Sequence, residues 1–502
     1  MSAATIHARL RAVSGGPEAR LLLADRLAEH GDGIKAVRHI AVAAKDGLAQ
    51  AQAKLGVCYL RGLGVPACLA EARYWLEQAA DGGDASAQTE LASLALSGVS
   101  GPYRRAAAFP EPDIRSGPDY PLAAGLARRA AHAGSPEAKA LLAAILRLAP
   151  WSAEDGDDAV ALNREAAQAG WPMGQLGHAM TMLQEGTDAS TRVANGLLSA
   201  AAASGLPTAH FLFAAMAETG TGMLPDMAVA VTHYRAAAEA GHNGAKTRLG
   251  LALLTGRGTR RNLVEAETWL RRAANHGDAL AAATLGDFHA SPERDPANLE
   301  EAAHWYRLAA EHDYPGAARQ LARIIATGAE GQPDPTEIAT WLETAIERGD
   351  TAAWPELGGV IASASLPPAQ LPALHDWLQR MIREDRPEAG FYVGVCVNNG
   401  IGTPTDAKLA RRYYLWAAGE GVLEGMVAAG EMLLNGRGGK ADPDLARALF
   451  QYAGKRGHAG AVFALGVMAG NDRDGAMMHF RRAAALGHQK ARIMTAECRA
   501  AV

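Results

Sequence analysis

Cysteine is scarce in this chain of 502 residues, which has four: Cys58, Cys68, Cys396 and Cys498. Secreted helical repeat proteins that rely on disulfides carry a pair of cysteines in each unit, so this number argues against that class. Cys58 and Cys68 are close in sequence, and a disulfide or a metal site is the alternative for them. We expect buried or half-buried free thiols.

Neither sign of charge dominates, and long apolar runs are missing. The chain has 49 Lys plus Arg and 54 Asp plus Glu, a net charge of -5. Without a basic field, nucleic acid is not an expected partner. No run approaches the roughly 20 apolar residues that span a bilayer, and Met1–Gly16 lacks the apolar core of a signal peptide. We therefore expect a cytoplasmic protein without membrane insertion.

Aromatic residues make up only 6% of the chain, whereas 49% of it is hydrophobic and much of that is alanine. This composition suits helices that pack closely through small side chains rather than a sheet with bulky layers. Two stretches, Ala51–Gly83 and Ala245–Gly277, share a Leu-Gly pair, a Gly-x-Gly turn, a Trp and an Ala-Ala-x-x-Gly ending at matching places. We interpret the chain as an array of two-helix repeats.

The ends of the repeats are evenly spaced. A Gly, or an Asp in its place, closes each repeat, and nine of the twelve intervals are 36 residues long. A fixed period of about 20 to 50 residues marks a solenoid, in which each unit packs on its neighbours. The repeat ends are Gly47, Gly83, Gly134, Gly170, Gly205, Gly241, Gly277, Asp313, Gly349, Asp385, Gly421, Gly457 and Gly487.

Each repeat carries the signals for two helices and a turn. In one repeat, Leu249, Gly250 and Leu253 make an apolar helical stripe, and the Gly lets the partner helix approach closely. The Gly-rich turn allows positive φ, and Asn262 or Asp406 is placed to cap the second helix. The second helix carries Ala-x-x-Trp/Tyr, and we expect its aromatic ring to fill the wedge between neighbouring repeats.

In Ala51–Gly83 the recurring residues are Leu55, Gly56, Tyr59, Gly62, Gly64, Val65, Ala72, Trp75, Ala79, Ala80 and Gly83. Their pattern resembles the Sel-one-like repeat, a relative of the tetratricopeptide repeat. The resemblance is strong near 51–83, 209–313 and 389–457 and weak in segments such as 135–205. It implies an all-α fold, an α-solenoid with a right-handed superhelix of about thirteen 36-residue helix-turn-helix repeats and a terminal capping helix.

Two segments depart from the period. A proline-rich insertion accounts for the interval of 51 residues between Gly83 and Gly134, and a Pro-Pro pair at Pro367 replaces a Gly-rich turn where we expect a bend. The insertion either grips a partner or is a tolerated surface loop, and its residues of interface type are Tyr103, Arg104, Arg105, Phe109 and Tyr120. The expected organisation is an N-terminal cap with the first repeats (1–98), the insertion loop (99–122), the repeat solenoid (123–488) and a C-terminal capping helix (489–502).

Motifs for chemistry are few. The Gly-x-Gly sequences lack the preceding strand and the third Gly of a dinucleotide loop. The acidic run Glu154–Asp158 is expected to support a helix N-terminus, with a cation site as the alternative. Without His-Glu-x-x-His, Cys-x-x-Cys or Gly-x-Ser-x-Gly, we expect no catalytic residue, metal or cofactor. Histidines at repeat ends are expected to act as imidazolium at helix dipoles: His132, His242, His276, His312, His458 and His488.

Resemblance to tetratricopeptide arrays implies that the first helices line a concave groove. The groove positions lie two before and two, five and six after the Leu of Leu-Gly or its substitute. In particular, Arg319 and Arg323 would clamp a carboxylate, and Asn398 and Asn399 would bond a peptide backbone. The large or polar residues at these positions are Arg61, Phe211, Glu218, Asp287, Arg319, Arg323, Phe391, Val395, Asn398, Asn399 and Glu431.

The family resemblance implies a non-enzymatic scaffold or adaptor that binds protein or peptide segments on its curved surface. Such proteins are associated with assembling complexes, signalling and bacterial envelope or polysaccharide systems. One alternative is a regulator that docks on a partner enzyme through the loop 99–122. Another is a small-molecule or glycan binder, or an enzyme of the cell-wall type, although the chain lacks the paired cysteines of that branch and any Ser-x-x-Lys.

Overall fold

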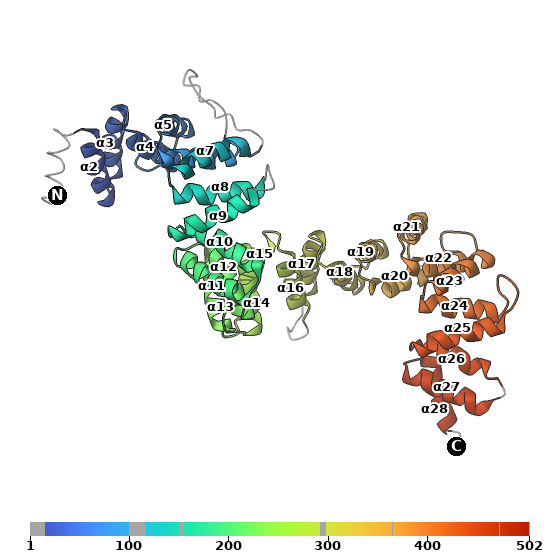
Figure 1. The fold of residues 1–502 in the computed structure, drawn as a ribbon. Coiled ribbons are helices and arrows are strands. Elements are labelled where there is room, and N and C mark those ends of the chain that lie inside the picture. The colour runs from blue at the N-terminus through green and yellow to red at the C-terminus, as the bar shows by residue number, and fades with distance from the viewer. Residues whose placement is uncertain are drawn as a thin grey trace. The chain divides into compact units, whose positions relative to one another are not determined.

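The structure is a computed structural model, and it describes residues 16–99, 117–149, 155–291, 298–363, 365–470 and 472–500, with the side chains of 497–500 excepted. Within these ranges the chain forms 27 helices and no β-strand (Figure 1). Two compact units are distinguished, Met1–Arg272 and Ala273–Val502. Each unit is a stack of antiparallel helix pairs, which confirms the expected all-α repeat fold.

Thirteen helix pairs and one last helix make up this fold. The first helices are α2 (Pro17–Glu29), α4 (Ala49–Arg61), α6 (Ala85–Leu96), α8 (Pro136–Leu148), α10 (Pro172–Glu185), α12 (Pro207–Thr219), α14 (Asn243–Thr255), α16 (Ala279–Ala290), α18 (Ala317–Ala326), α20 (Ala353–Ala362), α22 (Pro387–Asn399), α24 (Leu423–Leu434) and α26 (Ala459–Met468), followed by α28 (Gln489–Ala500). The second helices are α3 (Gly33–Lys45), α5 (Leu69–Asp81), α7 (Tyr120–His132), α9 (Asp155–Gln168), α11 (Asp188–Ala203), α13 (Met227–Glu239), α15 (Leu263–Ala274), α17 (Leu299–Glu311), α19 (Pro335–Glu347), α21 (Leu371–Arg383), α23 (Ala407–Gly419), α25 (Pro443–Lys455) and α27 (Arg473–Ala485).

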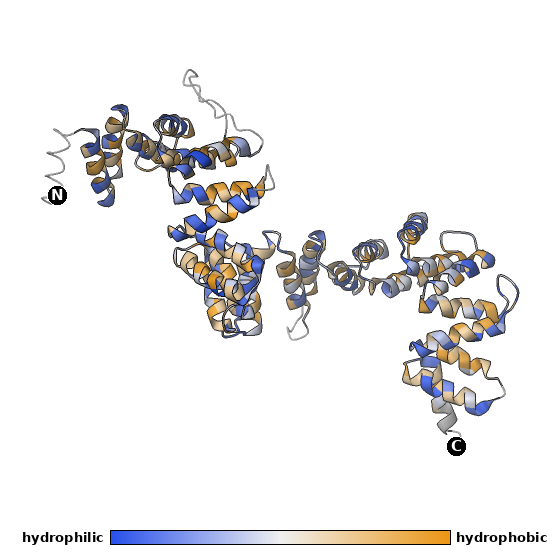
Figure 2. Ribbon diagram, in the orientation of Figure 1, coloured by the Kyte–Doolittle hydropathy of each residue, from blue (hydrophilic) through white to orange (hydrophobic). Residues whose placement is uncertain are grey.

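The core of each stack is made largely of alanine. The Ala-Ala of the repeat ending is buried, as Ala79 and Ala80 show with 0% and 5% exposure. Most helices carry apolar residues on one side and polar residues on the other (Figure 2). Segments that match the repeat pattern weakly, such as 135–205, form the same helix pairs, because small residues at the contacts suffice for close packing.

Backbone conformation explains the regular repeat ends. The Gly at each end has a positive φ, for example 84° at Gly83 and 94° at Gly421. Asp313 and Asp385, which stand where Gly is expected, are the non-glycine residues with positive φ in the described part of the chain, at 58° and 56°. Asp tolerates this left-handed conformation better than most residues, so the even spacing reflects a backbone requirement.

Close contact between the two helices of a pair explains the Leu-Gly motif. A Cβ atom at Gly250 would lie 2.7 Å from Cγ of Leu270 on the second helix. At Gly394 it would lie 2.5 Å from Cε1 of Tyr414. The expected role of this Gly, to let the two helices approach closely, is confirmed.

The Gly-x-Gly turn holds consecutive repeats together. Its second Gly packs on the first residue of the preceding second helix. A Cβ atom at Gly258 would clash with the carbonyl oxygen of Met227, and one at Gly438 would clash with that of Ala407. The expected caps also form, since Asp406 Oδ1 accepts hydrogen bonds from two backbone N–H groups of α23. These turns are structural, as their recurrence indicates.

Local features of the sequence account for the helices α2, α7 and α9. α2 packs with α3 as an ordinary helix pair, because both helices carry an apolar face. α7 begins at Tyr120, because the side chain of Asp119 caps its N-terminus. In α9 the first turn contains Asp155, Asp157 and Asp158, in agreement with acids that support a helix N-terminus.

The cysteines that the structure describes are free thiols. Cys58 and Cys396 are buried and Cys68 is half-buried, which agrees with the expectation. Burial raises the pKa of Cys396 to about 11. Cys498 lies outside the residues whose side chains are described. A thiol with a raised pKa is a weak nucleophile at neutral pH, so Cys396 has a packing role.

Candidate functional site

The first helices form one face in each unit. Consecutive first helices contact one another, including α4 with α6 and α6 with α8 in the first unit and α22 with α24 in the second. Because helix pairs are closest together on this side, it is the inner side of each stack. All eleven residues predicted for the groove belong to first helices: α4, α12, α16, α18, α22 and α24.

A hollow of about 560 Å³ opens on this face between α24, α26 and α28. Its apolar lining includes Leu434, Phe463 and Val467. Gly460 and Ala464 on α26 also line it, and their small side chains leave the space open. Three consecutive first helices therefore enclose a site large enough for side chains of another molecule.

One ring of this hollow is fixed and one side chain is free to make contacts. Phe463 stacks on His488, with ring centroids 4.3 Å apart and the planes at 16°. The Nδ1 atom of His488 accepts a hydrogen bond of 3.2 Å from the backbone N–H of Ala491, which holds the imidazole in place. Val467 is 55% exposed. The hollow thus offers a preorganised aromatic surface beside an exposed aliphatic one.

Opposite charges lie on the two outer helices of the hollow. Glu431 comes from α24 and Lys490 from α28, and both are exposed. The apolar residues of α26 come between them in the order of the stack. Asn435 adds a polar group beside Glu431, where its amide donates a 3.0 Å hydrogen bond to the Glu431 carbonyl oxygen. This polarity can orient a bound chain.

Several predicted groove residues are bound to their own repeat. The ring of Phe211 lies beside that of Tyr234 on α13, with the ring centroids 5.8 Å apart. Glu218 accepts a hydrogen bond of 2.7 Å from the hydroxyl of Tyr234, and Asp287 accepts one of 2.5 Å from a tyrosine of α17. These contacts tie a first helix to the second helix of its pair.

The predicted arginines are paired with carboxylates of the next first helix or of the turn before it. Arg61 forms an ion pair of 2.8 Å with a glutamate of α6. Arg319 lies 2.7 Å from Asp350 and 3.3 Å from Glu356, and Arg323 lies 3.5 Å from Glu356. The guanidinium of Arg319 is therefore already engaged, whereas the side chain of Arg323 is 58% exposed.

The predicted residues of α22 form a separate group. Phe391 is half-buried among the tyrosine rings of α22 and α23. Val395 is half-buried. Asn398 donates a 3.0 Å hydrogen bond to Asn399 and accepts one of 3.1 Å from Arg437. The two asparagines are brought together, and part of their bonding capacity is used within the protein.

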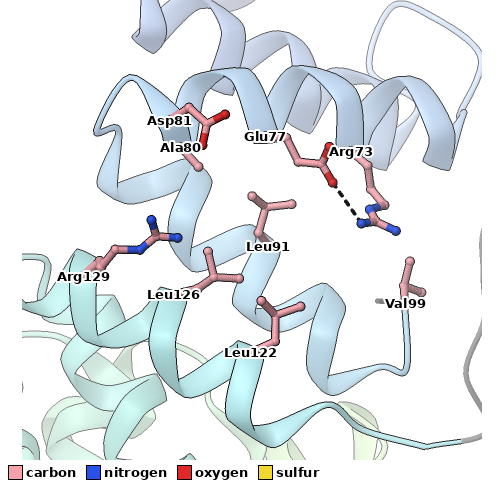
Figure 3. Close-up of a pocket in the computed structure, with 9 residues that line it drawn as sticks. All are labelled: Arg73, Glu77, Ala80, Asp81, Leu91, Val99, Leu122, Leu126 and Arg129. Atoms are coloured by element: carbon pink, nitrogen blue, oxygen red, sulfur yellow. Dashed lines mark hydrogen bonds and ion pairs between the residues drawn. The ribbon is translucent and has the colours of Figure 1, made fainter. Parts of the chain in front are cut away.

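The insertion residues Tyr103, Arg104, Arg105 and Phe109 lie outside the described residues, so their contact with a partner stays a prediction. Near the two described ends of the insertion, a hollow of about 360 Å³ lies between α5, α6 and α7 (Figure 3). Leu91, Leu122 and Leu126 line one side of it, and α5 lines the other with an ion pair of 2.9 Å between Arg73 and Glu77.

Sequence reasoning missed most of the C-terminal hollow. The positional rule that selected Glu431 also places Leu434 and Asn435 in the groove, five and six residues after Ala429. Applied to Leu465, it selects Phe463 and Val467. The sequence therefore contains the groove positions of these residues. They form a hollow only because α24, α26 and α28 are adjacent and because α26 contributes small residues to the lining.

The histidines that follow a repeat-end Gly differ from the expected imidazolium at a helix dipole. His242, His458 and His488 are N-caps of the next first helix, and Nδ1 of each accepts a hydrogen bond from a backbone N–H at 3.2, 3.3 and 3.2 Å. Only neutral imidazole can accept there, and a positive charge is unfavourable at a helix N-terminus. Burial accordingly lowers the pKa of His242 and His488.

This capping role predicts a loss of stability in acid. Because the folded protein lowers the pKa of His242, the unfolded chain binds the proton first, so stability falls as the pH drops below about 6.5. We expect His242→Asn, which caps without titrating, to reduce the fall in unfolding free energy between pH 7.5 and 5.0. His242→Ala should lose about 1 kcal/mol at pH 7.5. Urea unfolding at both pH values checks this, and an unchanged pH dependence in His242→Asn would contradict it.

Comparison with known families gives seven matches to the Sel1 repeat, at residues 49–84, 207–242, 244–278, 280–314, 387–422, 423–458 and 460–488. No curated protein sequence matches the chain. In the part of the chain that the structure describes, no helix is both long and apolar enough to cross a membrane.

Solved structures are similar in fold. A protective antigen present in uropathogenic Escherichia coli strains, described as displaying an SLR fold, has a TM-score of 0.56 and 22% sequence identity, over 91% of this chain and 94% of its own. A Sel1 repeat protein from Oxalobacter formigenes has a TM-score of 0.32 and 24% identity, over 55% of this chain and 96% of its own. The first of these supports the assignment of the fold and nothing beyond it.

Proposed function

Since this chain carries seven Sel1 repeats, we propose that it is a non-enzymatic scaffold that binds a segment of a partner protein on the face of its first helices. The observation that carries the proposal is the hollow between α24, α26 and α28, at positions where the repeat pattern places a groove. Protein interfaces depend on a few anchor residues that insert into well-formed pockets, and this hollow is such a pocket.

The lining of the hollow specifies the kind of segment. Phe463 and Val467 provide an apolar floor for one aliphatic or aromatic side chain of the partner. Glu431 on α24 favours a basic residue on one side of that anchor, and Lys490 on α28 favours an acidic residue or a terminal carboxylate on the other. The partner segment is therefore extended, with an apolar anchor between a basic and an acidic residue.

Selection from a random peptide library on the full chain tests this function. We expect the enriched peptides to share an apolar anchor with a basic residue on one flank and an acidic residue on the other. A synthetic peptide of that pattern should bind in isothermal titration calorimetry, and a matched peptide with both charges inverted should bind at least about tenfold more weakly. Enrichment of peptides without an apolar anchor, or equal binding of the two peptides, would reject the proposed site.

A further inference from the structure

A polar contact recurs between consecutive second helices. In the first unit, Glu265 on α15 forms an ion pair with Arg235 on α13 and accepts a hydrogen bond of 3.4 Å from the indole of Trp269. In the second unit, Glu337 on α19 lies 3.3 Å from Arg307 on α17 and accepts a bond of 3.3 Å from the indole of Trp341. Each Arg thus pairs with a glutamate of the next second helix that also accepts a hydrogen bond from the indole of a Trp on that helix.

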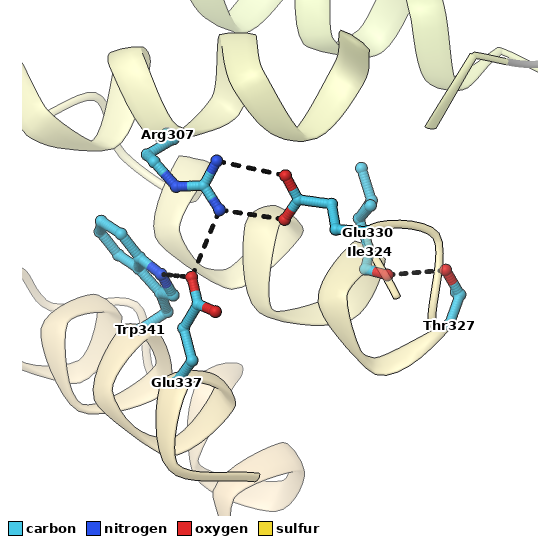
Figure 4. A network of polar contacts seen from close by, with 6 residues as sticks. All are labelled: Arg307, Ile324, Thr327, Glu330, Glu337 and Trp341. Carbon is cyan, nitrogen blue, oxygen red and sulfur yellow. Dashed lines mark hydrogen bonds and ion pairs between the residues drawn. The ribbon is translucent and has the colours of Figure 1, made fainter. Parts of the chain in front are cut away.

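In the second unit, Arg307 binds a second carboxylate, that of Glu330 (Figure 4). The two nitrogens of the Arg307 guanidinium donate to the two oxygens of Glu330 at 3.3 and 3.0 Å. Glu330 lies in the connection between α18 and α19, so one guanidinium joins α17 to two places in the next repeat. Such a bidentate contact fixes the plane of the guanidinium.

One repeat later, the same positions carry different residues. Thirty-six residues after Arg307, Glu330 and Glu337 stand Glu343, Leu366 and Ala373, whereas Trp377 retains the Trp of Trp341. The cation is thus replaced by a carboxyl group and both carboxylates by apolar side chains. The indole of Trp377 donates instead to Glu347, at 2.9 Å.

These replacements leave a cavity of about 80 Å³ between α19 and α21. Glu343, Leu366 and Ala373 all line it, together with Thr340 and Gln370. Within the described residues Glu343 has neither a hydrogen bond nor an ion pair. The site thus holds a carboxyl group, polar side chains that can hydrogen-bond and an apolar wall, in the place that a guanidinium occupies one repeat earlier.

Near neutral pH, the protonated and ionised forms of Glu343 are both populated. Its pKa is raised to about 7, mainly by burial and also by the neighbouring carboxylate of Glu347 on α19, while Arg380 on α21 acts in the opposite direction. Arg380 is held by Glu347 at 2.6 Å, so it does not neutralise Glu343 by direct contact. A cation brought to Glu343 would stabilise the ionised form.

We propose that the cavity between α19 and α21 is a binding site for the guanidinium group of an arginine side chain of a partner protein. One repeat earlier, the guanidinium of Arg307 lies between the carboxylates of Glu330 and Glu337, and Glu337 also accepts a hydrogen bond from the indole N–H of Trp341. Here the carboxyl group of Glu343 lines the cavity at the position that corresponds to Arg307, and the residues that line the cavity include no arginine. The site is on second helices, so it is separate from the hollow on the first helices and can exist without it.

Proton linkage follows from this site. Arginine binds the ionised form of Glu343, and that form makes up about one tenth of the protein at pH 6 and about nine tenths at pH 8 for a pKa of about 7. The affinity for an arginine side chain should therefore be about tenfold lower at pH 6 than at pH 8. Glu343→Gln should abolish both the binding and this pH dependence.

The probe is N-acetyl-arginine amide, with N-acetyl-citrulline amide as its neutral control of the same shape. Incorporation of 5-fluorotryptophan makes Trp377 a reporter, and Trp377→Phe assigns its ¹⁹F resonance among the nine tryptophans. We expect a saturable shift of that resonance with the arginine probe at millimolar concentration, stronger at pH 8, and none with the citrulline probe or in Glu343→Gln.

Several results would overturn the proposal: no saturable shift, equal response to both probes, or binding to the wild-type chain that does not change with pH. A response to N-acetyl-lysine amide of equal strength would also reject the assignment to guanidinium. Val467→Arg, which alters the first-helix hollow, should leave the shift unchanged, so failure of that hollow as a peptide site and failure of this cavity can be told apart.

Discussion

We expect Gly394→Ala to lower the free energy of unfolding by about 2 kcal/mol, although alanine is the better helix former. The new Cβ would lie 2.5 Å from Cε1 and 2.6 Å from Cδ1 of Tyr414. That ring is only 5% exposed, so it has little room to move. Overpacking costs about 3 kcal/mol and the gain in helix propensity returns about 1 kcal/mol. Denaturant unfolding of the two chains measures the difference.

Gly419→Ala is the matched control, because the same substitution there should change stability in the opposite direction. Gly419 is helical and exposed, and a Cβ at this position would meet no atom within 4 Å. Only helix propensity acts, and we expect a gain of about 0.5 kcal/mol. If both variants gained stability, the close helix contact would not be the reason for the Gly of the Leu-Gly motif.

The sequence predicts the repeat fold well because the period is set by backbone conformation. A residue with positive φ must follow each second helix, and only Gly or, as at Asp313 and Asp385, a tolerant substitute occurs there. The second Gly of the turn must leave room for a neighbouring carbonyl oxygen, because a Cβ atom there would clash with it, as at Gly438. Such requirements are local and recur in every repeat, so they can be recognised from a single sequence. The ends of the insertion are harder to predict from the sequence, because a helix cap such as Asp119 is a single residue and does not recur with the period.

The sites were predicted less well, because they depend on pairs of repeats rather than on one. The rule for groove positions selects Glu431, which lines the C-terminal hollow, but the pairing of Arg319 with Asp350 and Glu356 depends on the register of two neighbouring helices. The carboxyl group of Glu343 is unremarkable in its own repeat. It becomes informative only when its position is compared with that of Arg307 one repeat earlier. That comparison requires the structure, which shows which positions of consecutive second helices meet.

We expect Val467→Arg to weaken binding of the selected peptide about 100-fold. Val467 is exposed on α26 and lines the middle of the hollow, so the substitution fills the apolar space and leaves a charge that the bound peptide must desolvate. The loss corresponds to about 3 kcal/mol, which is typical of a central interface residue. Val467→Ala should weaken binding by only about fivefold, because it removes two methyl groups without adding a charge. Calorimetric titration of both variants measures the series.

Val264→Arg is the control for the charge itself. Val264 is 79% exposed on the second helix α15, away from the first-helix face, so the same substitution adds the same charge without touching the hollow. Affinity should stay within about twofold of the wild-type value. Equal losses in Val264→Arg and Val467→Arg would assign the effect to net charge, whereas loss in Val467→Arg alone, graded through Val467→Ala, requires that the peptide lie against α26. Circular dichroism of each variant, with helicity unchanged from the wild-type chain, ensures that the titrations compare folded proteins.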